Sequence, residues 1–470
     1  MAYEASGAGT AAGGNTLVIP GEMAARVDRL PMSFMAWEIC LIVQIGWACA
    51  VGTDAIAARM YPFVWLPAKE ITHSQYDVLY ALEVGIGILI GGYAMGWLSD
   101  KIGRRPSLVL SSVLAAVFIW PFAYVTNYPA LALLSIGSTL GIGGYLAINV
   151  VYMSEIMGPT VRPRIMMVSQ TVCIFLLLVV LGGIIPHYWF PSQYKLYLWL
   201  LAGLNVLVAV YLALRMPESP RWLEARERRD AARQIVGRME KRVSKGGRVA
   251  LPEPDLRPYE VVAEEKTSWL APWARQYVAA TVFLLVVMVL GYAGIVYGGN
   301  SQIVLFLVLD RGYNAGTVFA LTAWAGVVAS AVYLLNAFFG QRFERRWTQL
   351  VGGVLFAGAY WGMYASHSRP ALTTWFILAN VGGILWLWSM YVYIPNNFPT
   401  RMRSLGTGWT DGIGHLGAWG GVLIAGQLFV VTDPRPFFLF ITIPCAILPA
   451  LLIGIFGRNQ RRRALEELAR

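Results

Sequence analysis

Apolar stretches of about 20 residues or more recur along the chain, separated by short polar segments. A helix needs about 20 apolar residues to cross a bilayer, whereas a barrel strand needs only about 9–11. Because backbone groups in lipid must find hydrogen-bond partners within the protein, stretches of this length predict membrane-spanning helices. The predicted spans are 34–64, 77–99, 106–125, 129–153, 164–186, 193–214, 277–308, 315–338, 347–365, 371–394, 404–431 and 434–457.

One long polar loop, residues 215–276, divides these spans into six and six. The pattern therefore predicts an all-α membrane protein whose twelve transmembrane helices form two six-helix bundles. Residues 218–242 are charged and contain no proline after Pro220, which predicts a helix that ends at Lys245-Gly246-Gly247. The predicted parts are a flexible N-terminal segment (1–33), two bundles (34–214 and 277–457), the loop with its helices (215–276) and a tail (458–470).

Composition agrees with this picture, since 57% of the residues are hydrophobic and 13% are charged. Soluble domains average about 45–50% apolar residues and about 25% charged residues. The net charge of +11 does not indicate nucleic-acid binding, because the basic residues lie between apolar spans. The cysteines lie inside spans without paired spacing, so no disulfide framework, metal site or cofactor is expected. They are Cys40, Cys49, Cys173 and Cys445.

The distribution of Lys and Arg predicts the orientation, because these residues accumulate on the cytoplasmic side of a membrane. If both termini and residues 215–276 are cytoplasmic, six of the 37 Lys and Arg residues fall on the outer side. These six are Arg59, Lys69, Lys195, Arg311, Arg369 and Arg435. The pattern predicts a multi-pass protein of the inner membrane with both termini inside.

The two halves carry matching motifs at nearly one offset. A Gly-led basic motif begins at Gly96 and again at Gly340, and a Pro-Thr motif begins at Pro159 and again at Pro399. Tandem repeats of this kind are typical of secondary transporters, whose substrate site lies near the midplane where the halves meet.

Three motifs resemble those of a known family. Gly96-Trp-Leu-Ser-Asp-Lys-Ile-Gly-Arg-Arg resembles the signature loop of the major facilitator superfamily. Pro217-Glu-Ser-Pro-Arg-Trp-Leu is similar to the segment after the sixth helix of sugar porters. The run from Tyr393 to Trp409 resembles the corresponding junction in the niacin, aromatic-acid and organic-ion branch. The resemblance implies a monomeric transporter for a small molecule, and not an enzyme.

Charged residues near the inner ends of the spans are candidates for a cytoplasmic gate. Asp100 lies at a helix C-terminus, where the helix dipole disfavours a negative charge, so it needs cationic partners. Arg104 and Arg105 are local candidates, and the pairs Glu155 with Arg162 and Glu218 with Arg221 extend the set. The resemblance implies that such residues bridge helices and close the inner side; ordinary loop charge is the alternative. The candidates are Asp100, Arg104, Arg105, Glu155, Arg162, Glu218, Arg221, Arg401 and Arg403.

Charges inside the spans are costly and indicate function. Asp54 and Glu83 each lie about five residues outward of the middle of their spans, roughly 7 Å from the midplane at 1.5 Å per residue. Burial and a like charge raise the proton affinity of a carboxylate, so either one is a candidate for proton coupling. Arg59 is close enough to pair with Asp54, either as part of a substrate site or as a permanent outer lock.

Further candidates lie in the second half and in the fifth span. Asp411 and His415 share a helix face and are candidates for proton coupling or, for His415, substrate binding, although His415 could simply pair with Asp411. A Gly-rich stretch in 277–308 predicts a broken helix that lines a pocket. The candidate substrate ligands are Arg59, Gln170, Tyr292, Tyr297, Asn300, Trp386, Trp388, Tyr391 and His415; for the aromatics, packing is the alternative.

The pattern as a whole indicates a secondary active transporter, with proton-coupled uptake of a small organic acid or related metabolite as the leading interpretation. A sugar or polyol porter and a proton-coupled exporter are the alternatives within transport. A membrane sensor built on a transporter fold is a remote alternative, because residues 215–276 show no signalling motif.

Overall fold

A computed structural model describes most of the chain. The described residues are 10–11, 15–18, 22–31, 33–60, 71–72, 75, 78–79, 81–125, 127–158, 161–190, 192–256, 259–262, 270–296, 303–304, 306–339, 345–398, 403–428 and 435–458.

The first half consists of six long helical segments, several of which change from α- to π- or 3-10 geometry along their length. In chain order they are α2 (Phe34–Met60); η2 (Leu82–Gly87) with α5 (Ile88–Ile102); α6 (Arg104–Ile119) with η3 (Trp120–Ala123); α7 (Tyr128–Glu155); α8 (Arg162–Ile174) with η4 (Phe175–Ile184) and α9 (Ile185–Trp189); and α10 (Tyr194–Arg215).

The second half repeats this plan. Its segments are α13 (Val278–Gly291) with η6 (Tyr292–Val296) and η7 (Phe306–Asp310); α15 (Ala315–Phe339); α16 (Arg345–Ala365); α17 (Arg369–Tyr393) with η9 (Ile394–Asn397); α18 (Arg403–Leu428); and α19 (Arg435–Phe437) with η11 (Phe438–Thr442) and α20 (Ile443–Phe456).

Each of the twelve predicted spans coincides with one of these helical segments. Ten of the described helices are long and apolar enough to cross a membrane. The other two, α16 and α18, occupy the predicted positions but carry more polar residues, among them Arg345 and Gln349 in α16 and Asp411 and His415 in α18. The all-α membrane fold is confirmed.

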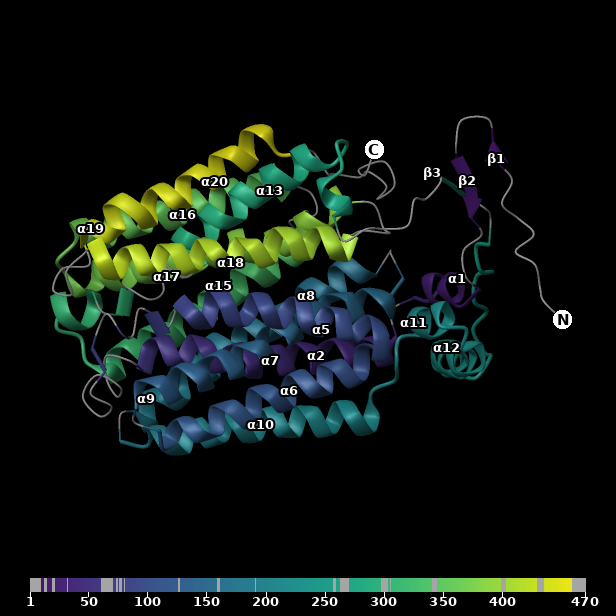
Figure 1. Cartoon of the computed structure of the whole chain (residues 1–470), viewed down its shortest axis with the longest axis horizontal. Coiled ribbons are helices and arrows are strands. Elements are labelled where there is room, and N and C mark those ends of the chain that lie inside the picture. Colours follow the sequence, from purple (N-terminus) through teal and green to yellow (C-terminus); the bar gives the residue numbers. More distant parts are fainter. Residues whose placement is uncertain are drawn as a thin grey trace.

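The helices run side by side, with the second-half helices α13, α17, α18 and α20 above α2, α6 and α10 in Figure 1. The halves meet where α5 and η2 pack on α18, and where α8 and η4 pack on α15. Both contacts depend on glycine. A Cβ at Gly85 would lie 2.6 Å from the Cβ of Trp419, and a Cβ at Gly183 would lie 2.6 Å from the Cβ of Ala323. Backbones approach closely here because these positions lack side chains.

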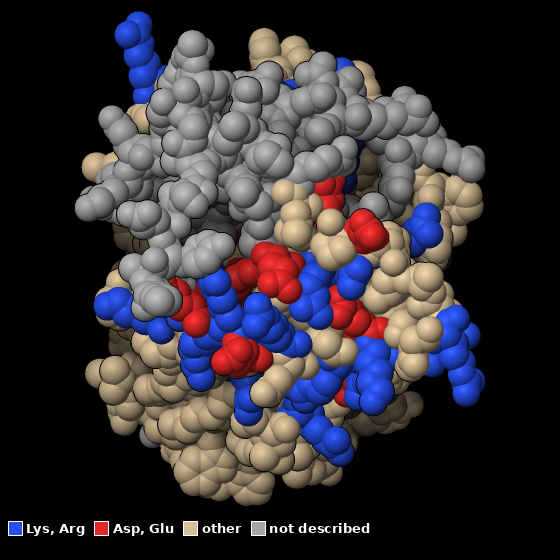
Figure 2. Space-filling model, turned by 90° about the vertical axis from the view of Figure 1, so that its right-hand side faces the viewer, with Lys and Arg blue, Asp and Glu red and all other residues tan. Residues whose placement is uncertain are grey.

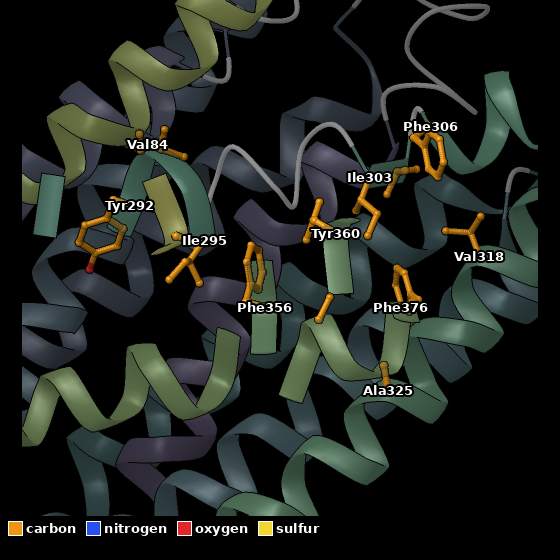
Figure 3. Close-up of a cluster of buried hydrophobic side chains, with 14 of the residues drawn as sticks. Val84, Tyr292, Ile295, Ile303, Phe306, Val318, Ala325, Phe356, Tyr360 and Phe376 are labelled. Carbon is orange, nitrogen blue, oxygen red and sulfur yellow. The ribbon is translucent and has the colours of Figure 1, made fainter. Parts of the chain in front are cut away.

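Aromatic side chains pack inside the second half (Figure 3). The rings of Phe356 and Tyr360 stack with centroids 4.6 Å apart, and Phe438 meets Tyr360 edge-on at 5.0 Å. Phe306 contacts the same Phe438 at 5.2 Å. Edge-on and offset contacts of this kind add to the stabilisation from buried area, so this cluster fixes α16 against the η7 and η11 segments.

A small non-membrane layer lies at one end of the bundle, at the right of Figure 1. We call this end the loop end. It contains α1 (Glu22–Asp28), α11 (Pro220–Ala225), α12 (Arg229–Val243) and a sheet of order β1-β2-β3 formed by β1 (Thr10–Ala11), β2 (Asn15–Val18) and β3 (Tyr259–Val262). Both strand pairs are antiparallel, and Leu17 lies opposite Glu260. A short 3-10 helix, η5 (Ala271–Trp273), precedes α13.

Two sequence predictions change at the loop end. The single helix expected over 218–242 is two helices, because the chain turns between α11 and α12 with Glu227 at φ 60°. Its predicted end is confirmed, since Lys245, Gly246 and Gly247 all have positive φ after α12. The segment before residue 34, expected to be flexible, contains α1. Arg26 of α1 forms an ion pair of 2.6 Å with Glu240 of α12.

Candidate functional site

The seventh span leaves α-helical geometry where the sequence predicts a break. After Gly291 the hydrogen-bond pattern becomes π-helical over Tyr292–Val296, and the Gly-rich residues that follow lie outside the described part of the chain. A π-turn rotates the side chains that follow it and is frequent at functional sites. Tyr292, the first residue of this turn, is almost fully buried.

Tyr292 connects two helices through its hydroxyl group. The hydroxyl donates to Asp411 Oδ1 at 2.6 Å and lies 2.9 Å from the hydroxyl of Tyr391. A hydroxyl has one proton to donate, so with Asp411 ionised the Tyr391 hydroxyl must donate to Tyr292. The result is a directed chain from Tyr391 through Tyr292 to Asp411. Protonating Asp411 allows the direction of the chain to reverse.

His415 lies one helical turn after Asp411. Its Nδ1 lies 2.9 Å from the Asp411 carbonyl oxygen, and because a carbonyl only accepts, Nδ1 carries the hydrogen. The imidazole faces the Tyr292 ring with centroids 4.2 Å apart. The expected face shared by Asp411 and His415 is confirmed, although the histidine bonds to the backbone of Asp411.

Three aromatic residues from both halves meet beside this chain of hydroxyls. Trp47 of α2 lies 4.9 Å from Trp388 and 5.9 Å from Tyr391, measured between ring centroids. Trp388 and Tyr391 themselves are 6.2 Å apart. We call Trp47, Trp388 and Tyr391 the aromatic wall. It spans the boundary between the two bundles.

Trp386 does not belong to this wall, contrary to the sequence expectation. Residues two apart on an α-helix point about 200° apart, so Trp386 and Trp388 face nearly opposite sides. Trp386 is fully buried inside the second half, where a Cβ on Gly291 would lie 2.0 Å from its ring and a Cβ on Gly352 2.8 Å from its backbone nitrogen. Its role in the structure is packing.

Gln170 of α8 also reaches across the boundary. Its Oε1 accepts a hydrogen bond of 3.0 Å from the Tyr333 hydroxyl of α15, and both side chains are buried. Tyr333 in turn lies 6.2 Å from Trp388 between ring centroids. Gln170 is therefore connected through Tyr333 to the aromatic wall, and its role in substrate binding stays a prediction.

The remaining candidates near the midplane are only partly described. Glu83 is buried, with 3% exposure, in η2. Asp54 and Arg59 lie on α2, but their side chains are outside the described part. Tyr297 and Asn300 lie outside it altogether.

A second group of charges surrounds the turn between α5 and α6 at the loop end. Gly103 has φ 112°, a conformation that favours glycine, and the turn exposes the first amides of α6. The carboxylate of Glu218 accepts hydrogen bonds from the amides of Arg104 and Arg105 at 3.0 and 3.2 Å. Burial raises the pKa of Glu218, and the amide bonds from Ser219, Arg104 and Arg105 partly offset that rise.

Arg104 joins two carboxylates in this group. It pairs with Asp100 at 2.7 Å and with Glu155 of α7 at 2.9 Å. The Arg104 side chain is 11% exposed, and that of Glu155 is 16% exposed, whereas Asp100 is 73% exposed. The indole of Trp222 donates to the Asp100 carbonyl at 3.0 Å, which attaches α11 to the end of α5. We call Asp100, Arg104, Glu155, Glu218 and Arg221 the charge cluster.

Two expected pairings in this cluster are wrong. Glu155 pairs with Arg104 instead of Arg162, whose guanidinium donates to the Met157 carbonyl at 3.1 Å. Arg221 pairs with Asp28 of α1 at 2.5 Å and donates to the Glu155 carbonyl at 3.1 Å, so it does not pair with Glu218. Glu218 caps the start of α6, where helix N-termini favour an anion.

The other expected gate residues are placed as follows. The Arg105 guanidinium donates to the carbonyl of Ala213 at the end of α10. Arg401 lies outside the described residues, and for Arg403 only the backbone is described. Within the described part, the partners of the charge cluster all belong to the first half, α1 or the loop.

Sequence reasoning missed several of these residues. Trp47 and Tyr333 lie within apolar spans, where aromatic residues usually pack or anchor the interface, so nothing in the pattern singled them out. Asp28 lies in a segment for which no structure was expected. Trp47 lies at the middle of α2 (Phe34–Met60), and a tryptophan there gives no signal until the opposite helix is known.

Comparison with known proteins agrees with this architecture. The sequence model of the family described as "Sugar (and other) transporter" matches residues 37–468, and the chain belongs to that family. It is a multi-pass membrane transporter of the major facilitator superfamily and not an enzyme.

Relatives and solved structures agree over nearly the whole chain. The niacin transporter NiaP of Acinetobacter baylyi is 22% identical, with 95% of this chain and 99% of that protein covered. The 4-hydroxybenzoate transporter PcaK of the same organism is 25% identical, with coverage of 86% and 88%. A partially occluded inward-open structure of the xylose transporter XylE from E. coli superimposes with a TM-score of 0.69 at 15% identity, covering 92% of this chain and 99% of that one.

Proposed function

We propose that this transporter is a proton-coupled symporter of the inner membrane that imports a small planar organic acid or a related metabolite. One observation carries the proposal: the chain of hydroxyls that ends on Asp411 lies beside the aromatic wall, where the two halves meet. A titratable carboxylate and a surface for a flat ring thus lie together. Relatives that carry niacin and 4-hydroxybenzoate support a planar substrate.

The aromatic wall gives such a substrate a stacking surface. Ring-to-ring contacts add about 0.5–1.5 kcal/mol beyond area burial. Since Trp47 belongs to the first half and Trp388 to the second, a substrate that contacts both changes its contacts when the halves rock. That difference between states is what allows binding to drive a conformational change.

Asp411 is the proposed proton carrier. When Asp411 is ionised it accepts from Tyr292, and when protonated it donates, so a bound proton reverses the bond between α18 and η6. The proton loads from outside and leaves inside. Asp54, Glu83 and His415 remain the alternative carriers.

Orientation and gating belong to the same proposal. Lys, Arg, Asp and Glu side chains gather at the loop end (Figure 2), which supports placing both termini and residues 215–276 in the cytoplasm. The proposed parts are the two bundles 34–214 and 277–457 joined by the loop, acting as a monomer. The charge cluster holds α5, α6, α7 and α11 as one unit that moves during gating.

Substrate-driven proton uptake in vesicles tests the proposal. Purified protein is reconstituted without a pH gradient, and external alkalinisation is recorded on adding aromatic acids, aliphatic acids, sugars, polyols or organic cations. The account predicts alkalinisation with planar acids at rates above those of empty vesicles. Transport of labelled acid without any alkalinisation would contradict proton coupling.

A sugar or polyol is the second candidate, favoured by the buried Gln170–Tyr333 hydrogen bond. The same panel distinguishes the two. If sugars alone drive uptake and aromatic acids do not compete, the planar-acid assignment is wrong and the polar pair near Gln170 becomes the substrate site.

A further inference from the structure

A cavity of about 730 Å³ lies at the loop end, apart from the aromatic wall. Its walls are the ends of α2, α6 and α10 on one side and α11 and α12 on the other. Ile235, Arg238 and Arg242 of α12 line it together, because residues three and four apart share a helix face. The cavity therefore lies where the membrane-spanning helices meet the amphipathic loop helix.

The charge of this cavity is unbalanced. Five arginines and two glutamates line it, and both glutamates are already engaged. Glu38 accepts a hydrogen bond of 2.7 Å from the Tyr211 hydroxyl, and Glu218 caps α6. The arginines are Arg105, Arg215, Arg228, Arg238 and Arg242.

Four of these arginines have no acidic partner among the residues that the structure describes. Arg105 donates to Ala213, whereas Arg215, Arg228, Arg238 and Arg242 form no ion pair within that part of the chain. By contrast, Arg26 and Arg29 at the same end of the bundle both pair with Glu240. A concave surface with charge of one sign focuses its field and attracts counter-ions.

The membrane side of the cavity is apolar. Leu214, beside Arg215, lines the cavity and is 76% exposed, and α10 continues outward with Leu207 at 65% and Val210 at 47%. Ile102 also lines the cavity and is 45% exposed. Exposed apolar residues next to a ring of arginines match a molecule with an anionic head and hydrocarbon tails.

We infer that this cavity binds the phosphate group of an anionic phospholipid from the adjacent leaflet. Guanidinium groups bind phosphate oxygens through paired, charge-assisted hydrogen bonds. Arg238 and Arg242 approach from α12, Arg228 from the turn before it and Arg215 from the end of α10, while the acyl chains lie along α10. The inference rests on the proposed membrane-spanning orientation but not on the substrate or on proton coupling.

The test measures lipid binding by the purified full-length protein. Detergent-solubilised protein is titrated with phosphatidylglycerol or phosphatidylcholine, and retained lipid is counted by native mass spectrometry. The cavity variant is Arg228→Gln/Arg238→Gln/Arg242→Gln. The matched control, Arg229→Gln/Lys245→Gln/Arg248→Gln, removes the same charge from exposed positions outside the cavity lining.

The wild-type protein and the control should retain phosphatidylglycerol in preference to phosphatidylcholine. The affinity of the cavity variant for phosphatidylglycerol should fall by about two orders of magnitude, because the variant removes three basic residues that contact the phosphate. An equal loss in the control would overturn the inference, because it would mean general surface attraction. Full displacement of the lipid by millimolar inorganic phosphate would overturn the lipid assignment, since the site would then be one for free phosphate.

Lipid binding is measured in detergent without any transport assay. The lipid test can therefore fail while the proton-uptake test succeeds, and the reverse. The four arginines are exposed, and thermal unfolding of each variant checks that the fold is unchanged. A Lys-for-Arg version of the cavity variant keeps the charge but loses the paired geometry, and it should regain part of the affinity.

Discussion

The hydroxyl of Tyr292 lies 2.6 Å from Oδ1 of Asp411 and 2.9 Å from the hydroxyl of Tyr391. These two bonds join three segments of the second half, η6, α18 and α17, at the place where Trp47 of the first half reaches across. Tyr292 therefore links Asp411, the proposed proton carrier, to Tyr391 of the aromatic wall.

Removing the Tyr292 hydroxyl should uncouple the proton from the substrate. Tyr292→Phe keeps the ring that faces His415 but loses both hydrogen bonds, and a bond to a charged group contributes about 1.5–3 kcal/mol. We expect accumulation in vesicles to fall about tenfold or more. Tyr197→Phe is the control, because it also loses one buried hydroxyl bond, to the Leu181 carbonyl, outside the site. Equal losses in the two variants would mean that Tyr292 acts only through stability.

The two tryptophans of α17 should behave differently. Trp388→Ala removes one of the three rings of the aromatic wall and should raise the KM for a planar substrate while the protein remains folded. Trp386→Ala opens a cavity in the second-half core and should lower the free energy of unfolding by about 3–5 kcal/mol. Transport kinetics and thermal unfolding of both variants provide the check. A raised KM from Trp386→Ala with normal stability, and none from Trp388→Ala, would reverse the assignment.

The charge cluster should depend on Arg104 far more than on Asp100. Asp100 is 73% exposed, and exposed ion pairs contribute about 0–1 kcal/mol. Arg104→Gln leaves Glu155 half-buried without its cation, a change that costs about 3–5 kcal/mol when the pair is fully buried and less here. Thermal unfolding in detergent should show a larger loss for Arg104→Gln than for Asp100→Asn. The opposite order would contradict the geometry of the cluster.

Docking of α1 on α12 should weaken in acid. The hydrogen bonds and charges of Arg26 and Arg29 lower the pKa of Glu240, against the opposing effect of burial. Because the pKa of Glu240 is lowered, Glu240 stabilises the contact between α1 and α12 fully at pH values above 4.5, its ordinary pKa. This stabilisation is lost as the pH falls through the lowered pKa. Amide exchange over residues 22–28 should therefore be protected near pH 7 and accelerate relative to its intrinsic rate below about pH 4.

Glu240→Gln should remove this protection at every pH, while Glu253→Gln, at an exposed position, should leave it intact. Protection that persists in Glu240→Gln would show that α1 is held by its other contacts, such as the bonds from the amides of Met23 and Ala24 to Glu224.

The sequence predicted the spans well because each needs a long apolar stretch, which is a local property of the chain. It also predicted the departure from α-helix at Tyr292, since glycines weaken a helix wherever they occur. The partners of Arg221 and Glu155 could not be predicted in this way. They depend on which helix ends meet in space, and Asp28 is 193 residues from Arg221 in the chain.

The aromatic wall shows the same limit. Trp388 and Tyr391 were candidates from the sequence, but Trp386 was an equal one, and only the direction in which α17 faces its neighbours separates them. Trp47 could be assigned to the wall only once α2 and α17 were seen to meet.

The most direct test of the central claim compares accumulation and exchange in Asp411→Asn. Asparagine resembles the protonated acid, so the loaded carrier can still cycle, but it cannot release a proton inside. Vesicles with an inward proton gradient are assayed for net uptake of the planar acid, and the same vesicles without a gradient for exchange of labelled against unlabelled acid. The account predicts that Asp411→Asn loses gradient-driven accumulation and retains exchange. Accumulation against a gradient with the wild-type pH dependence would contradict it, and the proton would then be carried by Asp54, Glu83 or His415.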